Sequence, residues 1–517
     1  MKMKWMMKMK TKIVTKPIYS TMKKYILLSI FSLFIFSCSK KEIIISGKIS
    51  NASPLSRIEI VDISSVATLP IINIGLDEKG NFSDTLSVEK SGIYAISYNG
   101  KNNFIYLKKG ENINISGNSA TFPEEMKFTG EGQGSNNFLI ESQKFIFSYF
   151  SKLNSNVLEK NESEFIKELE KYQADINKKI DEIAKEKKAD KEAVEWKKNF
   201  LMIDLLMVSS QYEMMHGQFT QKPDFKVSAK FREAQKKLEK ESFIKEYPAY
   251  RQYLLSKLQA DFSKFAMSYI NDTNITRTEI FLKFLETRKE FSQEQKDYLA
   301  AFIATHFDLQ PQNEKMEQVM KAINEKIKTE PIKKDLEKVY NTISGIKVGS
   351  PAPDASLLKQ DGKTGKLSEL KGKPTLLVFY SSWAPNMVEI TAPTIKEISE
   401  FYQSKMNFAY INLDDDAKQF QKTSKALFNG FTGTNFYAKG GLKSDAAQQF
   451  LVYGFKLPSF VVLDKEGKIA SKVFFNIADT NLIEILNKQT GLTAPVPQVS
   501  ETEEAPVSAA EAEAEEA

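Results

Sequence analysis

Cysteine and histidine are common nucleophiles, bases and metal ligands, and this chain of 517 residues has very few of either. Its single cysteine is Cys38, and its two histidines are His216 and His306. One cysteine cannot form a disulfide within the chain. A zinc site needs clustered cysteine and histidine ligands, and these three residues are far apart in sequence. We therefore expect no metal and no cofactor, and we assign both histidines to the surface or to packing.

Cys38 follows a segment with the features of a secretory signal. Met22-Lys23-Lys24 is basic, and residues 25–36 are apolar apart from two serines. That run is too short for a membrane-spanning helix, which needs about 20 apolar residues, but it fits a signal peptide. Because Met22 alone begins a complete signal, we expect residues 1–21 to come from a misassigned start, and we assign residues 1–37 to the signal.

The end of this segment, Ile35-Phe36-Ser37-Cys38, resembles a bacterial lipobox. The resemblance implies that Cys38 is lipidated, becomes the mature N-terminus and anchors the chain to a membrane. With Ser39 after the cysteine, it further implies an outer-membrane lipoprotein of the cell envelope. Lys40-Lys41-Glu42 does not decide between the periplasmic and the external face, and we expect the periplasmic one. The alternative is a buried structural cysteine behind an ordinary signal peptide.

The remaining chain divides into four regions by pattern, which predicts a multidomain α+β protein. Short runs rich in β-branched and aromatic residues, separated by Gly and Asn turns, predict an antiparallel β-sandwich over residues 38–133. The spacing of apolar residues predicts helices over residues 134–345. Over residues 346–492 strand and helix patterns alternate, as they do in an α/β layer fold. Residues 493–517 are mostly Pro, Ala, Ser, Thr, Val and Glu, which predicts a disordered acidic tail.

The helical region carries apolar stripes at steps of three and four residues. One stripe consists of Phe165, Ile166, Leu169, Tyr172, Ile176, Ile180 and Ile183. The stretch 202–215, with Met207, Met214 and Met215, could be a cofactor site, but we favour core packing because methionine fills irregular interiors.

The α/β region carries a specific family resemblance. Val348-Gly349-Ser350-Pro351-Ala352-Pro353-Asp354, then 367–374, a buried strand at 375–380 and Tyr453–Ile469 follow in order. They resemble the TlpA/ResA-like branch of the thioredoxin/AhpC-TSA superfamily, in which Pro458 would be the cis-proline. The sandwich pattern resembles the uncharacterised β-domain found at the front of thioredoxin-like envelope lipoproteins.

The resemblance fails at the residues that perform the family's chemistry. Family members have Trp-Cys-x-x-Cys, where a thiolate at a helix N-terminus attacks a disulfide and the second thiol resolves the product. This chain has Trp383-Ala384-Pro385-Asn386-Met387, and no other cysteine follows Cys38. Ser381 and Ser382 have no histidine nearby in sequence to activate them. Thiol–disulfide exchange is therefore excluded, and we expect no catalytic residue.

A binding surface could survive this loss. By position, Trp383, Leu457 and Pro458 match the family's groove for extended peptide. The alternative is that Trp383 and Pro458 serve only the stability of the fold. The acids Asp414-Asp415-Asp416 could suggest a divalent ion, but we favour a helix start, where carboxylates cap exposed N–H groups.

Charge argues against nucleic acid as a partner. The formal charge is +6, but residues 1–37 hold eight lysines and the tail from Glu501 holds seven glutamates. The body between them carries about +5 without a clustered basic face, which nucleic-acid binding requires. We therefore expect a redox-inert lipoprotein that binds an envelope protein or peptide. The alternatives are a thiol-disulfide oxidoreductase, as the family implies, and a purely structural lipoprotein.

Overall fold

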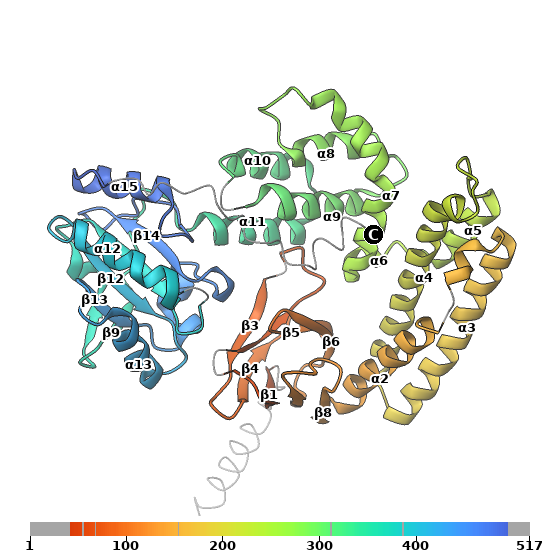
Figure 1. The fold of residues 1–517 in the computed structure, drawn as a ribbon, viewed down its shortest axis with the longest axis horizontal. Coiled ribbons are helices and arrows are strands. Elements are labelled where there is room, and N and C mark those ends of the chain that lie inside the picture. The colour runs from red at the N-terminus through yellow and green to blue at the C-terminus, as the bar shows by residue number, and fades with distance from the viewer. Residues whose placement is uncertain are drawn as a thin grey trace, which may run out of the picture.

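The computed structural model describes residues 42–53, 56–67, 69–152, 155–310, 313–384 and 387–494. The predicted signal, Cys38 and all but the first two residues of the predicted tail lie outside these ranges. The described chain comprises a β-sandwich, a helical region and an α/β domain, which confirms the predicted fold class (Figure 1). Within the described ranges, none of the helices has the length and apolar character needed to cross a bilayer.

The sandwich consists of two four-stranded sheets, ordered β4-β1-β7-β8 and β3-β2-β5-β6. Its strands are β1 Glu42–Ser50, β2 Arg57–Val61, β3 Pro70–Gly75, β4 Asn81–Ser87, β5 Gly92–Tyr98, β6 Lys101–Leu107, β7 Ile113–Asn118 and β8 Lys127–Gly130. Alternate residues such as Ile43, Ile45, Ile58 and Ile60 are buried between the sheets. One strand pair, β1 with β7, is parallel, where we predicted antiparallel pairing throughout. Side-chain alternation sets which face of a strand is buried and carries no information on its direction.

Helix α2, Gln133–Phe150, closes one side of the sandwich with two consecutive asparagines. Asn136 accepts a hydrogen bond from the Tyr106 N–H at 2.8 Å and donates one to the Tyr106 carbonyl at 2.9 Å, on the edge strand β6. Asn137 makes the equivalent pair of bonds with Phe128 on β8, the edge strand of the other sheet. Each side-chain amide thus stands in for a neighbouring strand, and edge groups that would otherwise be buried unpaired are satisfied.

Ten helices make up the helical region: α2, α3 Glu162–Lys187, α4 Lys191–Phe219, α5 Ala229–Leu238, α6 Phe243–Glu246, α7 Pro248–Ala266, α8 Arg277–Glu286, α9 Gln293–Ile303, α10 Met316–Lys326 and α11 Glu330–Ser344. The predicted stripe on α3 is confirmed, because all seven of its residues are buried. The prediction that the methionines of α4 pack in the core is wrong. Met207, Met214 and Met215 are 37%, 62% and 36% exposed. Helix α4 buries its opposite face, which includes Leu201 and Leu205, so the methionines point outward.

One histidine packs in the interior and the other lies at the surface, within the two roles that we expected. His216 is buried and its Nδ1 lies 2.8 Å from the Leu158 carbonyl oxygen. His306 stacks on the Phe302 ring, with ring centroids 3.7 Å apart.

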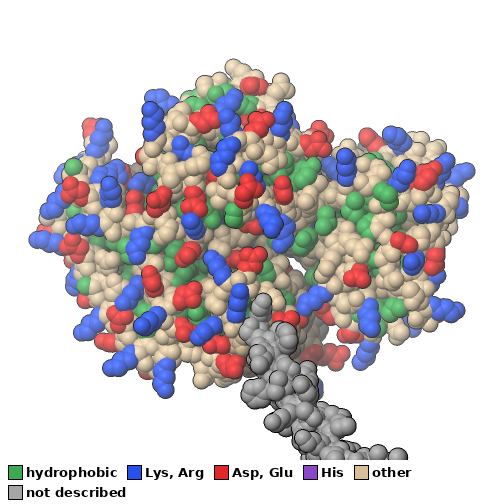
Figure 2. All heavy atoms as spheres, turned by 180° about the vertical axis from the view of Figure 1, so that it is seen from behind, with side chains coloured by type: hydrophobic (Ala, Val, Ile, Leu, Met, Phe, Trp, Pro, Cys, Tyr) green, Lys and Arg blue, Asp and Glu red, His purple; other side chains and the backbone are tan. Residues whose placement is uncertain are grey.

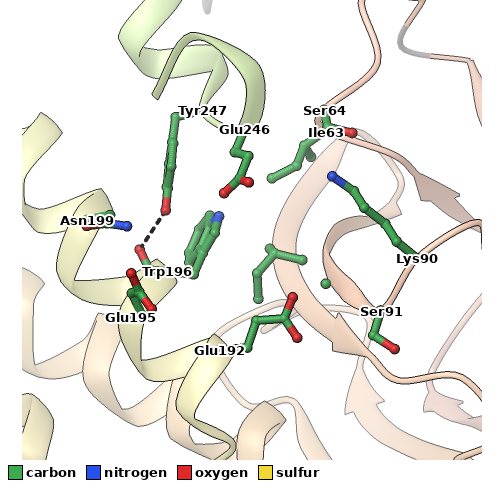
Figure 3. A pocket seen from close by; sticks show the side chains of 12 residues that line it. Ile63, Ser64, Lys90, Ser91, Glu192, Glu195, Trp196, Asn199, Glu246 and Tyr247 are labelled. Carbon is green, nitrogen blue, oxygen red and sulfur yellow. Dashed lines mark hydrogen bonds between the residues drawn. The ribbon is translucent and has the colours of Figure 1, made fainter. Parts of the chain in front are cut away.

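The outer face of the β3-β2-β5-β6 sheet joins the sandwich to the helices. Phe104 and Tyr106 on β6 lie against α4, where Phe104 contacts the Trp196 ring edge-on and the Tyr106 hydroxyl donates to Glu192 at 2.8 Å. A cavity of about 280 Å³ lies where this sheet meets α4 and α6 (Figure 3). Its carboxylates come from Glu192, Glu195 and Glu246, and the Tyr247 hydroxyl donates to the Trp196 carbonyl along one wall.

The α/β domain has a six-stranded sheet of order β10-β9-β13-β12-β11-β14. Its elements are β9 Ser356–Lys359, β10 Thr364–Lys366, β11 Thr375–Tyr380, α12 Ala392–Tyr402, β12 Asn407–Asn412, α13 Ala417–Phe428, β13 Thr434–Tyr437, α14 Asp445–Gln449, β14 Ser459–Leu463 and α15 Thr480–Thr490. Strand β11 is wholly buried between β12, parallel to it, and β14, antiparallel to it. The domain lies beside β3 and β4 of the sandwich (Figure 1). From behind, the surface is hollowed between this domain and the rest of the molecule, and charges of both signs are interspersed over it (Figure 2).

The edge-capping role of α2 is open to test by Asn136→Ala. The substitution removes both partners of the Tyr106 main chain at a fully buried position, and each buried unsatisfied group costs about 1–3 kcal/mol. We expect the free energy of unfolding in urea to fall by about 2–4 kcal/mol. Asn114→Ala, on the exposed face of β7, is the matched control and should change it by less than about 0.5 kcal/mol. Equal effects of the two substitutions would contradict the capping role.

Candidate functional site

The tryptophan turn lies at the carboxyl end of β11, beside the start of β14. The register pairs Phe379 with Ser459, so the turn that begins at Ser381 lies next to Pro458. The Leu457–Pro458 peptide bond is cis, as the family resemblance implies. Leu457 and Pro458 are both buried. The fold therefore brings together the two segments that sequence analysis paired as a groove.

Neither thiol position of the family carries a reactive atom. Ala384 is 7% exposed and Met387 is 2% exposed, and both side chains belong to the apolar core of the α/β domain. Pro385 and Asn386 lie outside the described residues. An alanine methyl group has no nucleophile, and a thioether neither ionises nor exchanges with a disulfide. The Ala384 and Met387 side chains therefore contribute to the packing of the domain core.

The serines of the turn have no histidine beside them. Ser382 donates its hydroxyl to Asp414 Oδ1 at 2.8 Å and its N–H to the same oxygen at 2.7 Å. Ser381 is fully buried, and its hydroxyl has no hydrogen-bond partner among the described residues. Both histidines belong to the helical region, one on α4 and one just after α9. The histidine that commonly activates a serine nucleophile is therefore not found among the described residues of this turn.

Trp383 is covered by an arginine from the sandwich. The Arg57 guanidinium, on β2, lies 4.2 Å from the centroid of the Trp383 ring. The indole Nε1 is buried, and no described residue accepts a hydrogen bond from it. A guanidinium within about 6 Å of an indole face is attracted by the ring quadrupole. The ring that would border a peptide groove thus has an intramolecular partner on one face.

Two further side chains fix Arg57 over the ring. Its Nη1 and Nη2 bind the two carboxylate oxygens of Asp415 at 2.8 and 3.0 Å, the paired geometry that arginine and carboxylate favour. Its Nε donates to the side chain of Asn73, and its Nη2 donates to the Asn73 carbonyl at 3.2 Å. Asn73 also donates to Glu59, whose pKa is raised by burial. We call Arg57, Asn73, Trp383 and Asp415 the arginine clasp.

Glycines permit this close approach. A Cβ on Gly75 would lie 2.2 Å from Asp415 Oδ2 and 2.9 Å from Arg57 Nη1. A Cβ on Gly454, in the loop before the cis-proline, would lie 3.0 Å from Asn73 Nδ2 and 3.2 Å from Trp383 Cη2. Contacts between 3.0 and 3.4 Å are tight, and those under 3.0 Å force a neighbour to move. The sandwich and the turn therefore meet where side chains are smallest.

The three consecutive acids have three different partners. Asp416 is the N-cap of α13 and accepts the Gln419 N–H at 2.8 Å, which confirms the predicted helix start. Asp414 is 1% exposed and accepts bonds from Ser382 and from Asn412 Nδ2, so it ties the turn to the end of β12. Burial, reinforced by the Asp414 charge, raises the pKa of the neighbouring Tyr380. Among the described residues, no group of three His, Cys, Asp or Glu side chains is placed to hold a metal ion.

Open space flanks the clasp on two sides. A cavity of about 910 Å³ is lined by Arg57, Trp383, the three acids and loop residues of the sandwich. A cavity of about 490 Å³ lies between β3 and the segment that leads to the cis-proline loop, with Leu442, Leu451 and Gly454 in its wall. After the turn, Val388 and Ile390 expose 70% and 57% of their surface. The described residues of this site form concave surfaces with apolar side chains at the rim, and they include neither a thiol nor a histidine.

Comparison with known proteins agrees with this domain structure. Residues 348–472 match the family model described as "AhpC/TSA family". The thioredoxin-like protein YneN of Bacillus subtilis is 28% identical over 138 residues, which are 25% of this chain and 76% of that protein. Two solved structures also match. The C-terminal domain of a putative thiol-disulfide oxidoreductase from Bacteroides thetaiotaomicron is 27% identical, with 24% and 86% of the two chains covered and a TM-score of 0.22. A putative thiol-disulfide oxidoreductase from Bacteroides vulgatus is 25% identical, with 28% and 91% covered and a TM-score of 0.24.

The C-terminal region is therefore a thioredoxin-like domain of the AhpC/TSA family, as sequence analysis predicted. Sequence analysis missed Arg57, Asn73 and Asp415 as neighbours of Trp383. Arg57 and Glu59 occupy the outward positions of an alternating strand, which a sequence does not distinguish from ordinary solvent-facing positions.

The clasp predicts measurable coupling between the sandwich and the turn. In double-mutant cycles, Arg57→Ala with Trp383→Leu should give a coupling energy of about 1 kcal/mol, since the stacked cation is largely desolvated. Arg57→Ala with Asp415→Ala should give less than about 1 kcal/mol, falling as salt increases, because Asp415 is half exposed.

Gly75→Ala provides an independent test of the same geometry, because its methyl group would displace the Asp415 carboxylate. We expect the arginine–aspartate coupling to vanish in the Gly75→Ala background. The exposed pair Lys363 and Asp361 is the control and should show no coupling. A coupling between Arg57 and Trp383 that is indistinguishable from zero would rule out the clasp as a stabilising contact.

Proposed function

We propose that this chain, whose C-terminal region is a thioredoxin-like domain of the AhpC/TSA family, is a membrane-anchored binding module of the cell envelope without thiol chemistry. The observation that carries the proposal is that Ala384 and Met387 are buried where the family has its two thiols, while the single cysteine of the chain is Cys38. The lipobox-like run before Cys38 supports an outer-membrane lipid anchor facing the periplasm. The names of the similar solved structures suggest the opposite, a thiol-disulfide oxidoreductase, and the absence of both thiols argues against that activity.

The binding surface that we propose is the rim of the turn. Val388 and Ile390 are exposed apolar side chains on the helical turn Met387–Thr391, which follows the tryptophan turn. Large apolar side chains that are exposed on one short turn favour a protein or peptide partner over free solvent. Because Arg57 covers Trp383 from the sandwich side, the partner would reach the domain from the side of Val388.

One observation favours a purely structural role as the second candidate. The arginine clasp uses Trp383, a residue of the family's ligand groove, to hold the sandwich in place. If the clasp has replaced the ligand altogether, the rim residues would bind nothing, and binding measurements distinguish the two candidates.

Redox inactivity is tested by the reduction of insulin with dithiothreitol as electron donor. The purified chain should give the rate of the buffer control, because no thiolate is available. Ala384→Cys combined with Met387→Cys should form a disulfide that dithiothreitol reduces, detected by thiol counting, because the turn geometry is already built. Turnover by the unchanged chain would refute the proposal. A folded double variant that forms no disulfide would show that the turn no longer has the family's geometry.

Binding at the rim is tested with an unfolded, carboxymethylated model protein as the probe. The affinity, measured by titration calorimetry, should fall at least tenfold in the double variant Val388→Glu, Ile390→Glu, because two apolar contacts of about 1.5 kcal/mol each are lost. Met267→Glu, at a residue 69% exposed in the helical region, is the matched control and should bind normally. Absence of any binding to the unchanged chain would favour the structural role.

A further inference from the structure

Among the described residues, strand β6 is an edge strand that is only half covered. It ends the sheet β3-β2-β5-β6, and the Tyr106 main chain at one end is paired with the Asn136 side chain of α2. Towards the other end, Lys101 and Asn102 are exposed and Asn103 is half-buried. The Asn136 side chain therefore covers the end of the strand at Tyr106 and does not cover residues 101–103.

The direction of the main-chain groups follows from Asn136. Both the N–H and the carbonyl of Tyr106 point out of the sheet, towards α2. Main-chain groups alternate along a strand, so those of Phe104 and Asn102 point out of the same edge. The tight turn Asn99-Gly100, with φ of 49° and 77°, agrees, because it makes Tyr98 and Lys101 a hydrogen-bonded pair and leaves Asn102 facing outward. Of these outward groups, the Phe104 N–H is bonded to the Asn103 side chain at 2.8 Å.

An apolar groove runs beside this open edge. Its volume is about 400 Å³, and its apolar walls come from three elements. They are Phe104 on β6, Ile140 and Phe147 on α2, and Phe200 on α4, with Ala95 and Pro123 between them. Phe147 is 73% exposed, which is unusual for an aromatic ring next to a concave apolar surface. The groove thus offers burial for a side chain directly beside main-chain groups that can pair with a strand.

The charges at the rim favour an acidic neighbour for the apolar side chain. Lys144 lines the groove, and Lys101 is the exposed first residue of the strand that borders it. Neither lysine forms an ion pair in the described part of the chain, and Glu124 is the single carboxylate in the groove lining. The occupant that fits all three features has free main-chain groups in extended form, an apolar side chain and an acidic flank. Free lipid or a folded helix offers no main-chain donors or acceptors, so neither matches the open edge.

We propose that the open half of β6 binds a short extended peptide segment of another protein by strand addition. The segment pairs with Asn102 and Phe104, places an apolar or aromatic side chain in the groove between α2 and α4, and ends where Asn136 already occupies the edge. This site lies on the sandwich, apart from the turn at Trp383, and it stands whether or not the rim of the turn binds a partner.

The probe for this site is a fluorescein-labelled peptide, acetyl-Asp-Thr-Phe-Thr-Val-Thr-amide, titrated with the whole protein and followed by anisotropy. We expect saturable binding that weakens at least tenfold with Phe147→Glu, which changes an exposed residue and spares the core. Asn102→Pro should weaken binding to a similar extent, because proline removes an outward N–H and is tolerated on an edge strand. A peptide that is N-methylated on the alternate amides that would donate hydrogen bonds to β6 should not bind.

Two control variants set the comparison. Met267→Glu, at a similarly exposed apolar residue far along the chain, and the rim variant Val388→Glu should both bind the peptide as the unchanged protein does. Thus a failed rim experiment and a failed β6 experiment are told apart.

Three results would overturn the proposal. The first is a lack of saturable binding to the unchanged protein. The second is binding that N-methylation and Asn102→Pro leave unaffected, which would mean apolar contact without strand pairing. The third is sedimentation of the unchanged protein as a dimer that Phe147→Glu converts to a monomer, which would make a second copy of this chain the occupant.

Discussion

The stacking of Arg57 on Trp383 is the contact on which the arrangement of this protein depends. It joins a strand of the sandwich to the turn that defines a thioredoxin site, across more than 300 positions of sequence. Asp415 and Asn73 hold the guanidinium in place, and Gly75 and Gly454 leave room for them. An exposed ion pair contributes little stability, but an arginine whose side chain is 9% exposed, stacked and hydrogen-bonded through four of its five N–H groups fixes a geometry as well as a distance. The clasp covers Trp383 on the sandwich side of this turn.

One sheet face organises the rest of the molecule. The polar half of the β3-β2-β5-β6 sheet, with Arg57 and Asn73, meets the α/β domain. The apolar half, with Phe104 and Tyr106, packs against α4, and Asn136 from α2 closes the edge beyond it. The sandwich is therefore the joint between the helical region and the thioredoxin-like domain. The arginine clasp and the open part of β6 lie towards opposite edges of the same sheet.

Local pattern predicted what local physics determines. Periodic burial gave the α3 stripe, the motif order gave the thioredoxin-like domain with its cis-proline, and capping chemistry gave the role of Asp416. Contacts between residues far apart in the sequence could not be predicted from local pattern. Nothing near Arg57 in sequence indicates Trp383, and strand alternation does not show that β1 runs parallel to β7. The exposed methionines of α4 reversed the expected packing because a helix with apolar residues on both sides does not reveal which side faces the core. Lys197 is the converse case: it is a charged residue that is 1% exposed, with its ammonium donating to Gln143.

The central claim is that the sandwich closes one side of a thioredoxin turn that has no thiols. Its most direct test is acrylamide quenching of Trp383 fluorescence in a chain in which Trp5 and Trp196 are replaced by phenylalanine. The account predicts weak quenching in that background and strong quenching, with a red-shifted emission, after Arg57→Ala, while circular dichroism stays unchanged. Equal and strong quenching of Trp383 with and without Arg57 would contradict it, because the ring would then be open to solvent and free to serve a ligand.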